Sequence, residues 1–349
     1  LAGGRFLVAW SSGCRQCGPT ALPSDFQDGD GDGVFARRFE SDGTPAGQEF
    51  QVNIYTTGSQ KLPSAAGTSD DRIVIVWQSG CDVPNGDCKD QDGSGTGVFM
   101  RTIVPSGGAG GIRTQVNENQ ANENQANENQ KNEIQKNEIQ VNELVTGNQV
   151  QPHVTVLSSG RILVVWVGPG QENSGNDIFG RIFESDGVPA GPSFMVNSST
   201  AADQIKPSAA PLVGGRFIVT WMSYGEEDGS KASILARWFK TDGTPDGGDL
   251  VVNTYTQWAQ ESPVVASETQ GRFALAWLGG PGAKWVSIRR SVAGGELEPA
   301  EFRANVFPEI TALRPALGVF KNGWTVAAWT SVSQDGDFAG VFARLFPPP

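Results

Sequence analysis

The sequence is poor in the residues on which much enzyme chemistry depends. Its 349 residues include one histidine, three tyrosines and four cysteines. The histidine, His153, follows Pro152 in an expected strand, so triads and metal sites that need several histidines are excluded. The chain also has no glycine-rich phosphate-binding motif and no nucleophile elbow. These absences predict a protein that is not an enzyme.

Long apolar runs and an excess of positive charge are absent as well. No stretch approaches the roughly 18 consecutive apolar residues of a membrane-spanning helix. Acidic residues number 38 and basic residues 26, which gives a formal net charge of −12. Nucleic acids and anionic membranes bind basic surfaces. We therefore expect no nucleic-acid partner and no membrane insertion.

What the sequence does contain is a sixfold repeat. An apolar strand that ends in tryptophan is followed each time by a second strand with arginine at its fourth position. The tryptophans are Trp10, Trp77, Trp166, Trp221, Trp277 and Trp329, and the arginines are Arg37, Arg101, Arg181, Arg237, Arg289 and Arg344. Both residues recur with the repeat, which indicates structural roles. We predict that the tryptophans pack between neighbouring sheets and that the arginines form hydrogen bonds between repeats.

Two further strands complete each repeat. One ends in asparagine, as in EFQVN (49–53), and a segment of small residues with a proline follows, as in LPSAA (62–66). Four short strands in roughly 55 residues are typical of one blade of a β-propeller. The sequence therefore predicts an all-β fold, a six-bladed β-propeller with four-stranded antiparallel blades. The small-residue segment is expected to be the innermost strand and the asparagine strand the outermost.

We interpret residues 1–349 as a single β-propeller domain that is incomplete at both ends. The blade repeats lie near 1–53, 60–117, 149–197, 204–253, 260–305 and 309–346. The first lacks an inner strand and the last an outer strand, which suggests a piece of a longer protein. A low-complexity insertion rich in Asn, Glu and Gln occupies 116–145. We interpret it as a surface loop without a function of its own. The alternative is that it forms a contact in a larger assembly.

The loops between the tryptophan and arginine strands are acidic and favour calcium. DGDGDG (28–33) resembles the opening of a calcium loop, in which alternate carboxylates converge and glycine permits the turn. The bidentate glutamate of a helix-loop-helix site is missing, so other ligands must complete the site. The candidate metal ligands are Asp28, Asp30, Asp32, Asp90, Asp92, Asp335 and Asp337. A solvated acidic turn without a metal is the alternative.

The four cysteines lie in the first two of these acidic loops. Cys14 and Cys17 follow the first repeat's tryptophan, and Cys81 and Cys88 follow the second's. The equivalent positions predict one disulfide per loop, Cys14–Cys17 and Cys81–Cys88, and hence an oxidising compartment. A zinc site of four thiolates is the alternative, and the spacings fit it poorly.

Four tryptophans stand outside the repeat pattern. They are the candidate ligand-binding residues Trp238, Trp258, Trp285 and Trp324. Exposed tryptophan can stack on sugar rings or anchor a protein partner, whereas packing in the core is the alternative.

The repeat phrases resemble those of large bacterial secreted and surface proteins. GRFLVAW, GVFARRFESDGTPAGQEFQVN and the following YTTGSQ are similar to repeats that accompany FG-GAP/VCBS and RTX segments. The resemblance implies a β-propeller used for adhesion or assembly and gives no catalytic residues.

Together these features predict a non-catalytic extracellular propeller, a binding, adhesion or assembly module stabilised by calcium. It would be found outside the cell, at the cell surface or in the periplasm, with a protein or glycan partner on its loop face. Two alternatives remain: a carbohydrate-active enzyme (a glycosidase or lyase) that uses paired carboxylates, and a structural subunit of a larger surface assembly.

Overall fold

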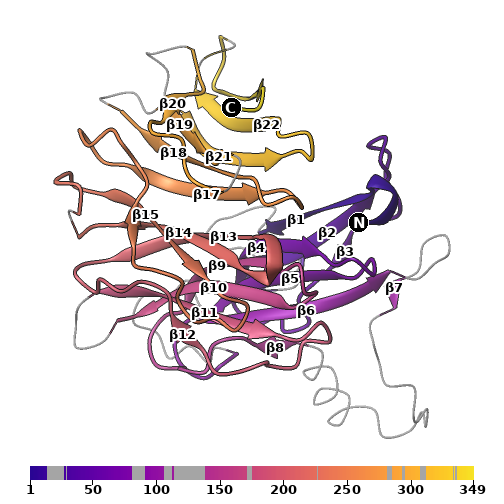
Figure 1. Ribbon diagram of the computed structural model, residues 1–349. Coiled ribbons are helices and arrows are strands. Elements are labelled where there is room, and N and C mark those ends of the chain that lie inside the picture. The colour runs from indigo at the N-terminus through magenta and orange to yellow at the C-terminus, as the bar shows by residue number, and fades with distance from the viewer. Residues whose placement is uncertain are drawn as a thin grey trace, which may run out of the picture. The chain divides into compact units, whose positions relative to one another are not determined.

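The strands predicted from the sequence are present as antiparallel sheets (Figure 1). The computed structural model describes residues 1–13, 27–28, 30–80, 91–105, 112–113, 138–170, 175–225, 227–280, 285–292, 295–306, 312–332, 334 and 336–349. Helix within these ranges is confined to the short 3-10 turns η1 (Ala2–Gly4) and η4 (Val213–Gly215). No helix in the same ranges is long and apolar enough to cross a membrane.

The first three sheets follow the order of the chain. The first contains β1 (Phe6–Ser12), β2 (Gly33–Phe39) and β3 (Phe50–Gln51). The second has the order β4 (Ser59–Gly67), β5 (Ile73–Gly80), β6 (Gly97–Pro105) and β7 (Ile112–Arg113), with β8 (Ile139–Gln140) also paired to β6. The third contains β9 (Val150–Val156), β10 (Ile162–Pro169), β11 (Asn176–Phe183) and β12 (Phe194–Met195).

The last three sheets repeat the same order of strands. The fourth contains β13 (Gln204–Pro211), β14 (Phe217–Ser223), β15 (Ser233–Phe239) and β16 (Leu250–Val251). The fifth contains β17 (Glu261–Ser267), β18 (Phe273–Gly279), β19 (Trp285–Arg290) and β20 (Phe302–Arg303). The sixth contains β21 (Ala312–Val319), β22 (Thr325–Val332) and β23 (Ala339–Phe346). The predicted fold class is confirmed: these sheets are the blades of an all-β six-bladed β-propeller.

The chain divides into two compact units. One contains Leu1–Val156 with Phe183–Ser193, and the other contains Leu157–Ile182 with Phe194–Pro349. In the second unit β13, β17 and β21, the first strands of their sheets, lie side by side (Figure 1). The first and last sheets have three strands each among the described residues, as the sequence predicts for blades that lack an inner or an outer strand.

The outer strand of the second blade differs from its expected position. The sequence places it at 113–117, but Ile139 and Gln140 pair with Met100 and Phe99 at the place of an outer strand. Asn142 then fills the role of the strand-end asparagine, because its side chain accepts a hydrogen bond from the backbone N–H of Val98 at 2.8 Å. Gln-Val-Asn occurs both before and after the insertion. The repeat pattern alone could not distinguish the two copies.

Burial explains the strand that ends in tryptophan. In β14 and β18 every residue is buried, as expected for a strand covered on both faces. The side chains of Trp77, Trp221 and Trp277 are 0% exposed. The indole N–H groups of Trp221 and Trp277 donate to Gln204 Oε1 at 2.8 Å and to Gln260 Oε1 at 3.0 Å. Trp166 and Trp329 are buried as well, so five of the six copied tryptophans are core residues, and Trp10 in the first blade is half-buried.

The repeated arginines join neighbouring blades, which confirms the predicted role. In four blades one guanidinium nitrogen donates to the backbone carbonyl just before the strand-end asparagine of the preceding blade. The bonds are Arg101 to Val52 (2.7 Å), Arg237 to Val196 (2.9 Å), Arg289 to Val252 (2.7 Å) and Arg344 to Ala304 (3.2 Å). Carboxylates add a second link at the same place: Glu138, Asp249 and Glu301 accept the two backbone N–H groups that follow the asparagine.

Replacing a buried blade-linking arginine should cost more stability than replacing an exposed one. Arg101 is 9% exposed, and burial lowers the pKa of its guanidinium although the charge of Glu138 opposes this. We expect Arg101→Leu to lower the free energy of unfolding by about 2–4 kcal/mol, because it leaves a buried backbone carbonyl without its hydrogen bond and removes the positive charge that offsets buried Glu138. Arg344→Leu removes the equivalent bond at an exposed site and should cost about 1 kcal/mol or less. Equal losses in calorimetry would contradict this account.

The single histidine predicts how stability depends on pH. Burial in β9 lowers the pKa of His153 to about 4 from an ordinary value near 6.5. Because the unfolded chain binds the proton more readily, this group's contribution is complete above about pH 6.5 and is lost as the pH falls toward 4. His153→Gln should flatten the stability curve between those values. Thermal unfolding at pH 4.5 and 7 measures it, and an identical pH dependence in both proteins would refute the assignment.

Candidate functional site

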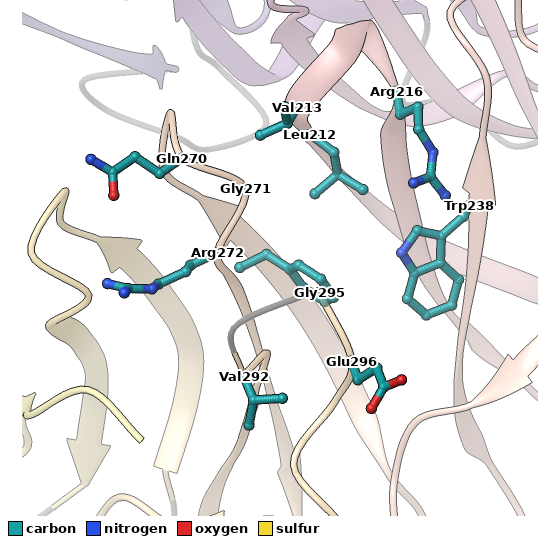
Figure 2. Close-up of a pocket in the computed structure, with 11 residues that line it drawn as sticks. Leu212, Val213, Arg216, Trp238, Gln270, Gly271, Arg272, Val292, Gly295 and Glu296 are labelled. Atoms are coloured by element: carbon teal, nitrogen blue, oxygen red, sulfur yellow. The ribbon is translucent and has the colours of Figure 1, made fainter.

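A pocket with a volume of about 520 Å³ opens between the turns of the fourth and fifth blades (Figure 2). Three turns build it: the one between β13 and β14, the one between β17 and β18, and the one between β19 and β20. Its lining residues are Leu212, Val213, Arg216, Trp238, Gln270, Gly271, Arg272, Phe273, Val292, Gly295 and Glu296. All of them belong to the second unit.

Backbone hydrogen bonds hold the first wall of the pocket in place. In the turn between β13 and β14 the N–H of Leu212 donates to the carbonyl of Arg216 at 2.7 Å. Gly214 and Gly215 take φ values of 75° and 78°, which glycine adopts without steric cost. The hydroxyl of Ser158 accepts the N–H of Gly215 at 2.8 Å. The turn therefore presents Arg216 from a fixed backbone.

The second wall is a turn organised by a buried carboxylate. Glu268 is 8% exposed and accepts the backbone N–H groups of Gln270 at 2.7 Å and Arg272 at 3.0 Å. Gly271 has a φ of 95°, and a Cβ there would lie 2.7 Å from a methyl group of Val213. The two turns thus meet closely, and Gly271 permits the contact.

One tryptophan and several charged groups face the cavity. Trp238 lies on β15 and meets the ring of Phe273 edge to face, with 6.2 Å between ring centroids. Figure 2 shows Arg216 and Glu296 on the same side as this indole, whereas Gln270 and Arg272 point away from it. Arg216 pairs with Asp246, which lies in the hairpin after β15, at 2.5 Å. The lining therefore offers the aromatic residues Trp238 and Phe273, the carboxylate of Glu296 and the guanidinium of Arg216, and Asp246 lies behind this lining as the partner of Arg216.

The sequence pointed to Trp238 alone among these groups. Arg216 belongs to a copied position, because an arginine begins five of the six tryptophan-strand phrases, and it therefore resembled a structural residue. Asp246 and Glu296 lie in turns whose acidic residues belong to none of the patterns that the sequence analysis identified. The signal that could have found them is the clustering of irregular residues in the fourth and fifth repeats.

The other predicted ligand-binding tryptophans lie elsewhere. Trp258, in the turn between β16 and β17, is 58% exposed. Trp285 begins β19, at the opposite end of that blade from the pocket. Trp324 precedes β22 and is 37% exposed. The structure therefore does not bring the four tryptophans into one site.

The described acidic residues of the first loop have protein partners. Asp28 accepts a hydrogen bond from the side chain of Asn53 at 3.3 Å, and Asp30 accepts one from the N–H of Gly58 at 3.1 Å. Asp32 forms an ion pair with Lys61 at 2.9 Å. Burial raises the pKa of Asp28, to which the charge of Asp30 also contributes, and hydrogen bonds oppose this.

The remaining calcium candidates are spread over other loops. Asp92 accepts a hydrogen bond from Asn142 at 3.3 Å, as Asp28 does from its own strand-end asparagine. Asp337 accepts the N–H of Phe338 at 2.8 Å. Asp90 and Asp335 lie outside the described residues, as do Cys14, Cys17, Cys81 and Cys88. Over the ranges that the structure covers, no group of three or more His, Cys, Asp or Glu side chains is arranged to hold a metal. Calcium and the two disulfides stay predictions.

Calcium in the first loop has a direct test. If Asp28, Asp30 and Asp32 turn toward a shared ion, calcium must raise the melting temperature, because ligand that binds only the folded state stabilises it. The expected shift is abolished by Asp30→Asn, whose side chain is exposed in this structure. A melting temperature that is the same in EDTA and in millimolar calcium would reject the site.

Comparison with known proteins identifies the fold and no family. No protein-family model matches the chain, and no curated protein matches it. Among solved structures, a protein of unknown function from Dyadobacter fermentans has a TM-score of 0.61 and 10% sequence identity, over 99% of this chain and 92% of that one. The NanB sialidase of Streptococcus pneumoniae has a TM-score of 0.58 and 8% identity, over 99% and 67%. An α-L-arabinofuranosidase of Fusarium graminearum has a TM-score of 0.51 and 12% identity, over 81% and 80%.

These findings correct the expectation of a non-catalytic binding, adhesion or assembly module that is not an enzyme. The proteins with stated activities among these structures are glycosidases and sialidases. At such low identity the likeness shows the fold alone, but it favours the carbohydrate-active alternative. The expectation rested on the scarcity of histidine and on a resemblance that gives no catalytic residues, and neither excludes glycoside hydrolysis by paired carboxylates, the alternative that the sequence left open.

Proposed function

We propose that this protein is a carbohydrate-active enzyme and that the pocket in Figure 2 holds one sugar unit of its substrate. The observation that carries the proposal is the position of Trp238, a tryptophan outside the repeat pattern, in a concave site that is also lined by Glu296 and by Arg216, the partner of Asp246. An aromatic face supplies apolar contact for a sugar ring, and a few convergent polar groups fix its orientation. The glycosidase propellers of similar fold support the same class of substrate.

The pocket also carries the groups that glycoside hydrolysis requires. One carboxylic acid protonates the glycosidic oxygen as the C–O bond breaks, and a second carboxylate either activates water or attacks the sugar carbon. The candidates are Glu296, which lines the pocket, and Asp246, whose backbone N–H donates to the carbonyl of Trp238 at 2.8 Å. Asp246 is paired with Arg216, so it suits the role of the charged base or nucleophile. Glu296, which is exposed at the pocket, then supplies the proton.

We propose a location outside the cytoplasm, with a glycan as the partner. The resemblance of the repeats to bacterial secreted and surface proteins supports this placement, as would disulfides in the two cysteine-bearing loops.

A hydrolysis panel tests the enzyme proposal. The intact chain is assayed on aryl glycosides that include α-L-arabinofuranoside and α-sialoside, the substrate types that the names of the similar structures suggest. We expect turnover of at least one, and a fall in kcat of about 100-fold or more for Glu296→Gln and for Asp246→Asn. Asp242 lies in the same hairpin as Asp246 and accepts hydrogen bonds from the N–H and the hydroxyl of Thr244, whereas Asp246 pairs with Arg216 of the pocket lining.

Asp242→Asn is therefore the matched control and should keep full activity. Melting temperatures of all three variants confirm that they are folded. Absence of turnover across the panel would reject the enzyme, and turnover unchanged in both pocket variants would place the chemistry elsewhere.

A further inference from the structure

Trp258 occupies a backbone position that is unfavourable for its side chain. Its φ is 72°, in the left-handed region. The equivalent position, five residues after the strand-end asparagine, holds Gly58, Gly147 and Ala202 in the preceding blades, with φ values of 72°, 77° and 59°. The turn therefore has this conformation in each of the four blades in which the structure describes it, and glycine or a small residue adopts it at less cost. A bulky residue there is a genuine outlier.

Packing does not account for this tryptophan. Its side chain is 58% exposed, so it contributes little to the core. The turn itself is held firmly, because the buried side-chain amide of Gln260 donates to the carbonyl of Trp258 at 3.2 Å. The backbone N–H groups of Thr254 and Tyr255 are bound by Glu301 at 2.7 and 3.1 Å. A rigid turn thus presents an exposed indole, and backbone strain of this kind clusters at binding sites.

A second irregular tryptophan lies beside the same turn. The rings of Tyr255 and Trp285 meet edge to face, with 5.7 Å between centroids. Trp285 takes the place that Gly33, Gly97 and Ser233 hold at the start of the corresponding strands. Gly280 accommodates it, because a Cβ there would lie 2.5 Å from the indole. The guanidinium of Arg303 stacks on the indole at 4.9 Å from the ring centroid.

This surface is separate from the pocket. Phe273, at one end of the seven-residue strand β18, lines the pocket, and Gly279, at the other end, pairs with Trp285. A strand of that length spans about 20 Å. The two sites therefore lie at opposite ends of the same blade.

We propose that Trp258, Tyr255 and Trp285 form a docking surface for an uncharged polysaccharide, which tethers a polymer while the pocket acts on a single sugar. Aromatic faces on a rigid turn suit a chain of sugar rings. The net charge of −12 opposes an anionic polymer. The guanidinium of Arg303 covers one face of Trp285, so that face is not available to a sugar ring. The inference takes its ligand class from the proposed function.

Affinity electrophoresis tests the surface without any need for turnover. The intact chain is run in gels that contain hydroxyethylcellulose, laminarin, dextran or, as an anionic comparison, polygalacturonate. We expect retardation by at least one neutral polymer, and an apparent dissociation constant that rises about fivefold or more in Trp258→Gly. Because glycine is the residue of the equivalent turns, this variant should fold with an unchanged or higher melting temperature.

Ala202→Gly is the matched control, since it relieves the same strain without removing an aromatic ring. It should be retarded like the wild-type chain, and Trp258→Phe should keep most of the retardation. The proposal is overturned if no neutral polymer retards the chain, if only polygalacturonate does, or if Trp258→Gly binds as well as the wild type. A dimer that Trp258→Gly converts to a monomer would also overturn it, since a second copy would then cover the surface.

The two proposals fail separately. Retardation without hydrolysis of any aryl glycoside would support the docking surface and reject the proposed enzyme activity. Hydrolysis without retardation would support the enzyme activity and reject the docking surface.

Discussion

A buried asparagine at the end of each outer strand organises the loops of this protein. Its side-chain carbonyl accepts the N–H of the neighbouring strand at 2.7–2.9 Å in the five blades that have an outer strand. Its amide donates to a carbonyl two residues further on in four of them. The same amides also donate to an aspartate, which is Asp28, Asp92 or Asp228 in a loop, or Asp177 at the start of β11. Because an unpaired buried amide is costly, this one residue fixes two loops at once.

The hydrogen bonds of this asparagine show which acidic residues have a structural role. Asp28 and Asp228 occupy the same place, but their environments differ. At Asp228 the hydrogen bonds from Ser230, Asn253 and Ser233 outweigh burial and lower the pKa, whereas at Asp28 burial prevails and raises it. Both carboxylates accept hydrogen bonds from the strand-end asparagine of their own blade. Trp238, Trp258 and Trp285 lie at positions that the asparagine does not engage.

The parts of the structure that the sequence predicted are those that are copied. Strand order, buried tryptophans and arginine links recur in blade after blade, so the repeat pattern carries them. The pocket could not be predicted, because its lining comes from turns far apart in the sequence and meets only after the fourth and fifth blades pack. The outer strand of the second blade was misplaced for a related reason: the insertion duplicates Gln-Val-Asn, and only the pairing of Ile139 and Gln140 shows which copy is used.

A propeller with a single histidine can still be an enzyme because its chemistry can rest on carboxylates alone. Fold similarity does not decide the matter, since unrelated activities share one scaffold and differ in the loops. The decisive features are therefore local. Trp238 and Glu296 line one pocket at one end of the blades, and Trp258 is held at the other end in a conformation that glycine or alanine adopts in the preceding blades. The strain at Trp258 is the stronger argument for function, because neither packing nor repeat symmetry explains a tryptophan there. A sequence under selection for stability alone would place glycine at this turn.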